Sequence, residues 1–165
     1  MTPKRRFTTQ EIVELSLLAV LMFLGKEAMS FIPNVHPVTV IILYTVIRFG
    51  YKALLPVICF VLLEITIYGF GIWTVMYFYS WPLLVFVAMP FRKETNWLGW
   101  ALLAGIFGLS FGALCSIPYI FLGGFKAAVT YWISGIPFDL IHGISGFIIT
   151  LIVLPLLCKL RDKIG

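Results

Sequence analysis

Long apolar segments separated by short polar or basic connections constrain this chain more than any other feature. Of its 165 residues, 61% are hydrophobic and 12% are charged, which is more apolar surface than a water-soluble domain can bury. A lipid bilayer is therefore the expected solvent. Because hydrocarbon offers no water, every backbone polar group must be satisfied within the chain, which leaves helices or a closed barrel. The unbroken apolar segments lack the alternation of barrel strands, so we expect a helical bundle.

About 20 apolar residues form a helix that crosses a hydrocarbon core of roughly 30 Å. By this criterion the sequence predicts six transmembrane helices in a single membrane domain, residues 1–165. The predicted spans are approximately residues 11–32, 37–49, 52–70, 72–91, 97–121 and 137–158. The second span is short, and its length also fits a re-entrant or interfacial segment.

The distribution of basic residues favours six crossings. If all six segments cross, one side receives ten Lys and Arg residues while the other receives only Lys126, which is the positive-inside pattern. The ten are Lys4, Arg5, Arg6, Arg48, Lys52, Arg92, Lys93, Lys159, Arg161 and Lys163. Without the second crossing this bias vanishes. We therefore predict a multi-pass protein of the cell membrane with both termini in the cytoplasm.

Charged residues inside predicted spans are functional candidates, because insertion scales put their cost at about 3 kcal/mol near the helix centre. Lys26 and Glu27 lie late in the first span and either extend to the outer interface or take part in binding. Glu64, near the outer end of the third span, is expected to line a cavity or to form a pair.

Asp139 and His142 are expected at the start of the last span. They are three residues apart and therefore share a helix face. Two interpretations stay open: the pair contributes to binding, or Asp139 caps the helix that follows Pro137.

Aromatic residues gather at the predicted outer ends of the spans. Some belong to the aromatic belt of any membrane protein, but the excess close to polar residues indicates an aromatic-lined pocket with a few converging polar groups. The predicted substrate-binding residues are Asn34, His36, Tyr68, Trp73, Tyr77, Phe125, Tyr131, Trp132, Asp139 and His142.

Searches of the sequence for catalytic and nucleotide-binding motifs find no G-x-S-x-G elbow, H-E-x-x-H pair or phosphate-binding loop. We therefore expect a binding and transport subunit rather than an enzyme, without catalytic residues or a cofactor. Two alternatives stay open: a small membrane enzyme that uses Glu64, Asp139 and His142 as acid–base groups, and an assembly subunit whose buried charges pair with a partner. No metal site is expected, because the three cysteines lack metal-ligand spacing.

Three segments together resemble an S component, the substrate-binding subunit of an energy-coupling factor (ECF) vitamin transporter. They read FIPNVHPVTVIIL after the first span, YGFGIWTVMYFYSWPL across the third-to-fourth turn, and YWISGIPFDLIHGISGFIITLIVLPLL through the last span. The resemblance covers most of the chain. Its N-V-x-P-V-T, G-x-W-T and F-D-L-x-H patterns are most similar to the branch associated with cobalamin and related corrinoids.

The resemblance implies an S-component-like bundle in the bacterial cytoplasmic membrane. It implies capture of a vitamin at the extracellular face, with cobalamin or a related corrinoid as the best match and another vitamin or precursor as the alternative. It also implies docking on a transmembrane coupling subunit (the T component), two cytoplasmic ATPases as the energy source, and toppling of the bundle to deliver the vitamin. Nucleic acid is not an expected partner.

The first helix is the expected docking surface for the coupling subunit. Members of this family typically carry an A-x-x-x-A pattern there, of which only Ala19 is present, with Ser16 as the nearest small neighbour. Small residues on one helix face suit the close approach of another helix, either a partner's or one of the same bundle. The expected coupling interface comprises Ser16, Ala19 and Phe23.

Overall fold

The computed structural model describes residues 7–164, and these residues form helices and connections without any strand. The expected all-α fold is confirmed. The elements in chain order are α1 (Thr9–Ala28), α2 (Val38–Phe49), the 3-10 helix η1 (Gly50–Ala53), α3 (Leu54–Tyr68), α4 (Ile72–Ala88), the 3-10 helix η2 (Met89–Phe91) and α5 (Trp97–Ile164).

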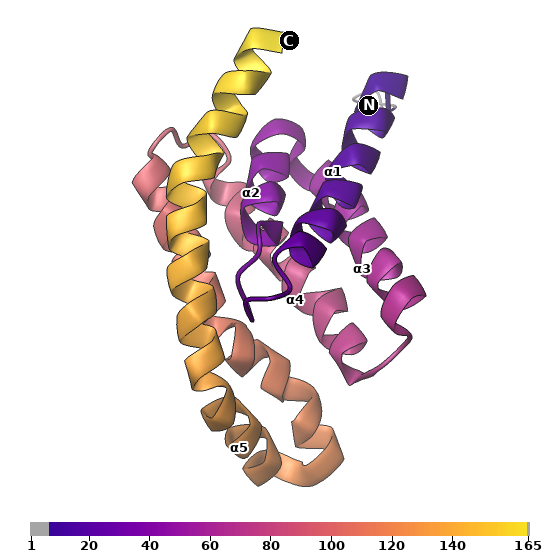
Figure 1. Cartoon of the computed structure of the whole chain (residues 1–165), viewed down its shortest axis with the longest axis vertical. Helices are drawn as coiled ribbons and strands as arrows, with labels where there is room; N and C mark the ends of the chain where they lie inside the picture. Colours follow the sequence, from indigo (N-terminus) through magenta and orange to yellow (C-terminus); the bar gives the residue numbers. More distant parts are fainter. Residues whose placement is uncertain (1–6, 165) are drawn as a thin grey trace, which may run out of the picture.

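α5 consists of two antiparallel helices, residues 97–122 and 125–164. Its helical geometry is interrupted at Gly123 and Gly124, and Gly124 has φ 76°, a left-handed value that glycine adopts at little cost. The two halves form the hairpin at the lower end of Figure 1. α1, α2, α3, α4 and these halves run in alternating directions, so the start of α1 and the end of α5 lie at the same end of the molecule (Figure 1).

The last helix is longer than the sequence predicts. It begins at Phe125 rather than near residue 137, and Pro137 lies within it. At a rise of 1.5 Å per residue, the segment 125–164 is about 60 Å long, roughly twice the thickness of a hydrocarbon core. Asp139 and His142 therefore lie inside a helix and not at its start, so of the two open interpretations the one in which Asp139 caps a helix after Pro137 is wrong. The first helix is shorter than predicted, because it ends at Ala28.

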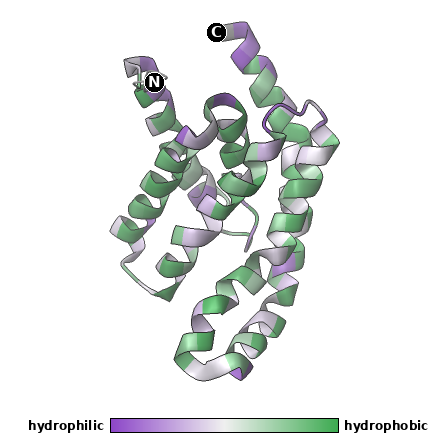
Figure 2. Ribbon diagram, turned by 180° about the vertical axis from the view of Figure 1, so that it is seen from behind, coloured by the Kyte–Doolittle hydropathy of each residue, from purple (hydrophilic) through white to green (hydrophobic). Residues whose placement is uncertain are grey.

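Three continuous helical stretches in the described part of the chain are long and apolar enough to span a membrane. They are Val38–Tyr68, Ile72–Phe91 and Trp97–Lys163. Many large apolar side chains on the outside of the bundle are exposed, among them Leu17, Leu62, Phe86, Ile106 and Ile152. Figure 2 shows that hydrophobic residues predominate along the helices, while hydrophilic residues are frequent near the two chain ends. These are features of an α-helical membrane protein.

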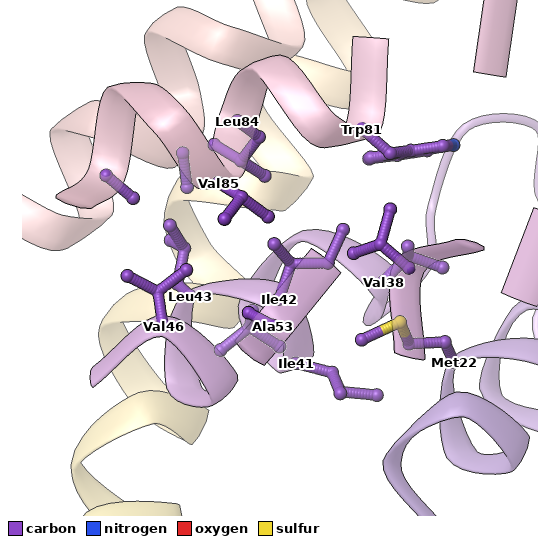
Figure 3. Packing of buried hydrophobic residues seen from close by; sticks show 14 of the residues in the cluster. Met22, Val38, Ile41, Ile42, Leu43, Val46, Ala53, Trp81, Leu84 and Val85 are labelled. Atoms are coloured by element: carbon purple, nitrogen blue, oxygen red, sulfur yellow. The ribbon is translucent and has the colours of Figure 1, made fainter. Parts of the chain in front are cut away.

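The short helix α2 lies at the centre of the bundle. Eight of its 12 residues are buried, and it contacts α1, α4 and α5. Val38 and Ile42 of α2 lie beside Trp81 and Leu84 of α4 in the core (Figure 3). Because α2 is surrounded by other helices, it is almost wholly apolar and has no polar face.

Ion pairs hold the start of α1 against the turn between α2 and α3. Lys52 Nζ lies 2.6 Å from Glu11 Oε1, and an Arg48 guanidinium nitrogen lies 2.6 Å from Glu14 Oε2. Arg92, which follows η2, donates hydrogen bonds to the carbonyl oxygens of Ile47 and Arg48. These three basic residues therefore share the end of the molecule that holds the start of α1.

The two halves of α5 cross in direct backbone contact. A Cβ added at Gly108 would lie 2.7 Å from Gly143 N and 2.7 Å from the carbonyl carbon of His142. A Cβ at Gly143 would lie 3.0 Å from the carbonyl oxygen of Gly105. Small residues allow this approach, as they do between many membrane helices. The crossing determines how Asp139, one turn before Gly143, meets the first half of α5.

Candidate functional site

An open cavity of about 450 Å³ lies between the α1–α2 connection, the start of α4 and both halves of α5. We call it the Asp139 cavity. The segments that line it lie in the half of the molecule that contains the turn of α5, away from the two chain ends (Figure 1). Five predicted binding residues line it, namely Asn34, Trp73, Tyr77, Tyr131 and Asp139.

Asp139 is the only charged residue among those that line this cavity. Its side chain is 6% exposed, and Oδ1 accepts a hydrogen bond of 2.8 Å from the backbone N–H of Gly112. Its other oxygen, Oδ2, has no hydrogen-bond partner among the described residues. A buried carboxylate oxygen is costly without a donor, so Oδ2 of this cavity-lining residue is an unsatisfied polar atom among the described residues.

Gly112 makes this arrangement possible. A Cβ at position 112 would lie 2.7 Å from Asp139 Oδ1 and 2.8 Å from its carboxyl carbon. The absence of a side chain therefore lets the carboxylate reach the backbone of the opposite helix.

Aromatic rings form much of the cavity wall. Trp73 and Tyr77 pack edge to face with centroids 5.4 Å apart, and Tyr77 packs in the same way against Phe111 at 6.3 Å. Tyr131 stacks on Tyr119 at 4.2 Å across the α5 hairpin. Phe111 was not predicted, because only aromatic residues near the ends of predicted spans were considered as binding residues. Gly112 was not predicted either, because a single glycine within an apolar segment does not indicate a binding site.

The two histidines lie behind the cavity wall and do not line it. Their ring centroids are 4.9 Å apart, and both rings pack edge to face against Trp81. His142 is 2% exposed. His36 Nδ1 and His142 Nε2 have no partner in the described part of the chain. Their predicted role in direct substrate contact is not supported by this placement, since the rings belong to the aromatic packing beneath the site.

Asn34 fixes the α1–α2 connection to the second half of α5. Its side-chain amide donates to the carbonyl oxygen of Phe138 at 3.1 Å, and its own carbonyl oxygen accepts from Ser145 Oγ at 3.2 Å. Its φ of 58° is left-handed, a conformation that asparagine and glycine tolerate better than other residues. Asn34 therefore positions one wall of the cavity.

Asn34→Ala is expected to lower the free energy of unfolding by about 2 kcal/mol, because it loses a hydrogen bond and places an alanine at positive φ. Asn34→Gly loses only the hydrogen bond, and about 1 kcal/mol is expected. Thermal unfolding of the purified variants in detergent measures the difference. Equal losses for the two variants would contradict a role for the backbone conformation.

A second cavity of about 370 Å³, the Lys26 cavity, is lined by Lys26, Glu64, Tyr68, Trp73 and Tyr77. Lys26 Nζ lies 2.6 Å from Glu64 Oε2 and 3.5 Å from Glu27 Oε1. It also lies 5.0 Å from the centroid of the Tyr68 ring, and the Tyr68 hydroxyl donates to Glu27. Lys26 is thus paired within the bundle, and the predicted residue Tyr68 belongs to this second cavity.

Two further predicted binding residues, like the two histidines, lie outside both cavities. Phe125 is 75% exposed and Trp132 is 42% exposed, both on the second half of α5. Their positions fit the aromatic belt of a membrane interface better than a binding wall.

The three residues of the expected coupling interface do not share one exposed surface. Ala19 is 2% exposed and packs inside the bundle, so it is not available to a partner in this structure. Ser16 is exposed and lies beside Leu55 and Cys59 of α3, while Phe23 is half-buried against the core. Ala19 therefore contributes to packing between helices of this chain.

The three ionisable groups considered for acid–base chemistry do not all line one cavity. Glu64 lines the Lys26 cavity, Asp139 lines the Asp139 cavity, and His142 lines neither. Within residues 7–164, no three His, Cys, Asp or Glu side chains form a group that could hold a metal ion.

No family model, curated protein or solved structure matches this chain.

Proposed function

We propose that this chain is the substrate-specific membrane subunit of an ECF-type importer that captures a vitamin at the extracellular face. Cobalamin or a related corrinoid is the first candidate, and another vitamin or precursor is the alternative. One observation carries the proposal: an open aromatic cavity is lined by a buried carboxylate, one oxygen of which has no partner among the described residues. Small-molecule sites combine apolar walls with a few placed polar groups in this way.

The proposed topology has six crossings with both termini in the cytoplasm. Arg48, Lys52 and Arg92 lie at the end that holds the start of α1, and Lys126 follows the α5 turn at the opposite end. The positive-inside rule then assigns the first end to the cytoplasm. In this orientation the Asp139 cavity lies toward the outside.

Transport against a gradient requires partners in this proposal, because the sequence contains no nucleotide-binding loop. A coupling subunit and two ATPases would supply the energy. The face of α1 that points away from the bundle exposes Leu17, Val20 and Leu24. In this proposal the coupling subunit docks on that face, without contact to Ala19.

Binding of a corrinoid by the purified chain tests the proposal, because corrinoids are coloured and absorbance follows the titration directly. We expect Asp139→Ala to weaken binding about tenfold or more, since a hydrogen bond to a charged group contributes about 1.5–3 kcal/mol. Asp162→Ala is the matched control, because Asp162 is exposed and pairs with Arg161 at the cytoplasmic end of α5.

Co-expression with a coupling subunit and ATPases should then give ATP-dependent uptake of the same ligand. Absence of corrinoid binding, or unchanged binding by Asp139→Ala, would contradict corrinoid capture in this cavity. A chemical product formed by the isolated chain would instead favour an enzyme.

A further inference from the structure

The two cavities adjoin, because the same two aromatic residues line both. Trp73 and Tyr77 lie one turn apart on α4 and form a common wall between the Asp139 cavity and the Lys26 cavity. A ligand that packs against these rings can therefore contact polar groups in both cavities.

The polar groups of this combined site carry an excess of carboxylates. Among the lining residues, the carboxyl groups of Asp139 and Glu64 are opposed by a single ammonium group, that of Lys26, which also lies 3.5 Å from Glu27 Oε1 outside the two linings. Glu64 is 2% exposed, and although Oε2 pairs with Lys26, Oε1 has no hydrogen-bond partner among the described residues. Each cavity thus holds a buried carboxylate oxygen with unused capacity to accept a hydrogen bond.

We infer that the captured ligand presents N–H donor groups, amide or cationic, to Asp139 and Glu64, and that ligands with carboxylate or phosphate groups at these positions are rejected. This inference rests on the proposed capture function and specifies its substrate class. In its ionised form a carboxyl group only accepts hydrogen bonds, and in that form it selects donors. The rings of Trp73, Tyr77 and Phe111 attract positive charge through their faces, whereas an anion would meet like charge in a low-dielectric setting.

For a corrinoid, the inference predicts which chemical form binds. A corrinoid whose peripheral side chains are amides offers N–H donors, while the same ring with these side chains hydrolysed to carboxylates offers only acceptors and negative charge. The two forms are nearly equal in size and shape, so the comparison isolates charge and donor capacity.

Titration calorimetry on the purified chain tests the inference with two matched pairs of probes. The first pair is an amide corrinoid and its carboxylate form; the second is tryptamine and indole-3-propionate, which share an aromatic ring system and differ in charge. We expect the donor member of each pair to bind at least tenfold more tightly than the acidic member. Asp139→Asn and Glu64→Gln should each reduce this preference, and Asp162→Asn should leave it unchanged.

Equal binding within both pairs, a preference for the acidic members, or a preference that survives both substitutions overturns the inference. Because the wild-type comparison needs no variant, a folding defect in either substitution leaves the test intact. Uptake of a corrinoid together with equal binding of its carboxylate form would retain the proposed function and reject the inference. A preference for tryptamine over indole-3-propionate without corrinoid binding would retain the inference and reject the corrinoid.

Discussion

Gly108→Ala is expected to destabilise the protein by about 3 kcal/mol or more and to reduce sharply the yield of folded material. The added methyl group would lie 2.7 Å from backbone atoms of both His142 and Gly143. Backbone atoms cannot rotate away as a flexible side chain can, so the two halves of α5 must separate. Overpacking usually costs about 1–3 kcal/mol, and a backbone collision at a helix crossing belongs at the upper end. Thermal unfolding in detergent and the monodisperse fraction in size-exclusion chromatography measure both effects.

Gly99→Ala provides the matched control in the same half of α5. A Cβ at position 99 would meet only the Asn96 side chain, at 3.9 Å or more. Since alanine has the higher helix propensity by about 1 kcal/mol, this variant is expected to be neutral or slightly stabilising. Similar behaviour of the Gly108 and Gly99 variants would mean that the α5 halves do not cross as described.

Lys26→Met is expected to lower the free energy of unfolding by about 3 kcal/mol. The substitution leaves Glu64, 2% exposed, without the ammonium group that lies 2.6 Å from its carboxylate. Removal of one member of a buried ion pair typically costs about 3–5 kcal/mol, and the partial exposure of Lys26 favours the lower value. The double variant Lys26→Met/Glu64→Met should regain most of the loss, because a well-packed apolar pair is often as stable as the ion pair.

Lys52→Met is the control at the other end of α1. Lys52 Nζ also lies 2.6 Å from a carboxylate oxygen, that of Glu11, but the Glu11 side chain is 28% exposed. Water can therefore solvate the carboxylate that remains, and a loss below about 1 kcal/mol is expected. Chemical or thermal unfolding of these three variants and the unchanged protein gives the comparison. An equal loss for Lys26→Met and Lys52→Met, or no recovery in the double variant, would show that burial of Glu64 is not what makes the pair important.

The sequence predicted features that depend on local composition. Apolar length identified the helical segments, and the basic residues identified one end of the bundle. The extent of the last helix was wrong, because Pro137 in the segment YWISGIPFD resembled a helix start. Proline is tolerated within membrane helices when neighbouring groups satisfy the freed carbonyl, and this cannot be read from one segment.

The other differences between the sequence predictions and the structure depend on contacts between segments that are distant in the sequence. Asp139 was identified as a candidate, but its partner is the backbone of Gly112, 27 positions earlier, and only the α5 crossing brings the two together. Ala19 was expected to contact either a partner helix or a helix of the same bundle, and the rotation of α1 against its neighbours buries it within the bundle. A single sequence contains the spacing of residues on a helix but not which face meets which neighbour.

The orientation of the Asp139 cavity is the central claim, because capture from outside requires it. With Cys59, Cys115 and Cys158 replaced by alanine, one cysteine is introduced either at Lys126, beside the α5 turn, or at Lys93, beside η2. A membrane-impermeant maleimide applied to intact cells should label Lys126→Cys at once, and should label Lys93→Cys only after the membrane is permeabilised. Labelling of both positions from the same side would contradict the six-crossing topology and, with it, an outward-facing capture site.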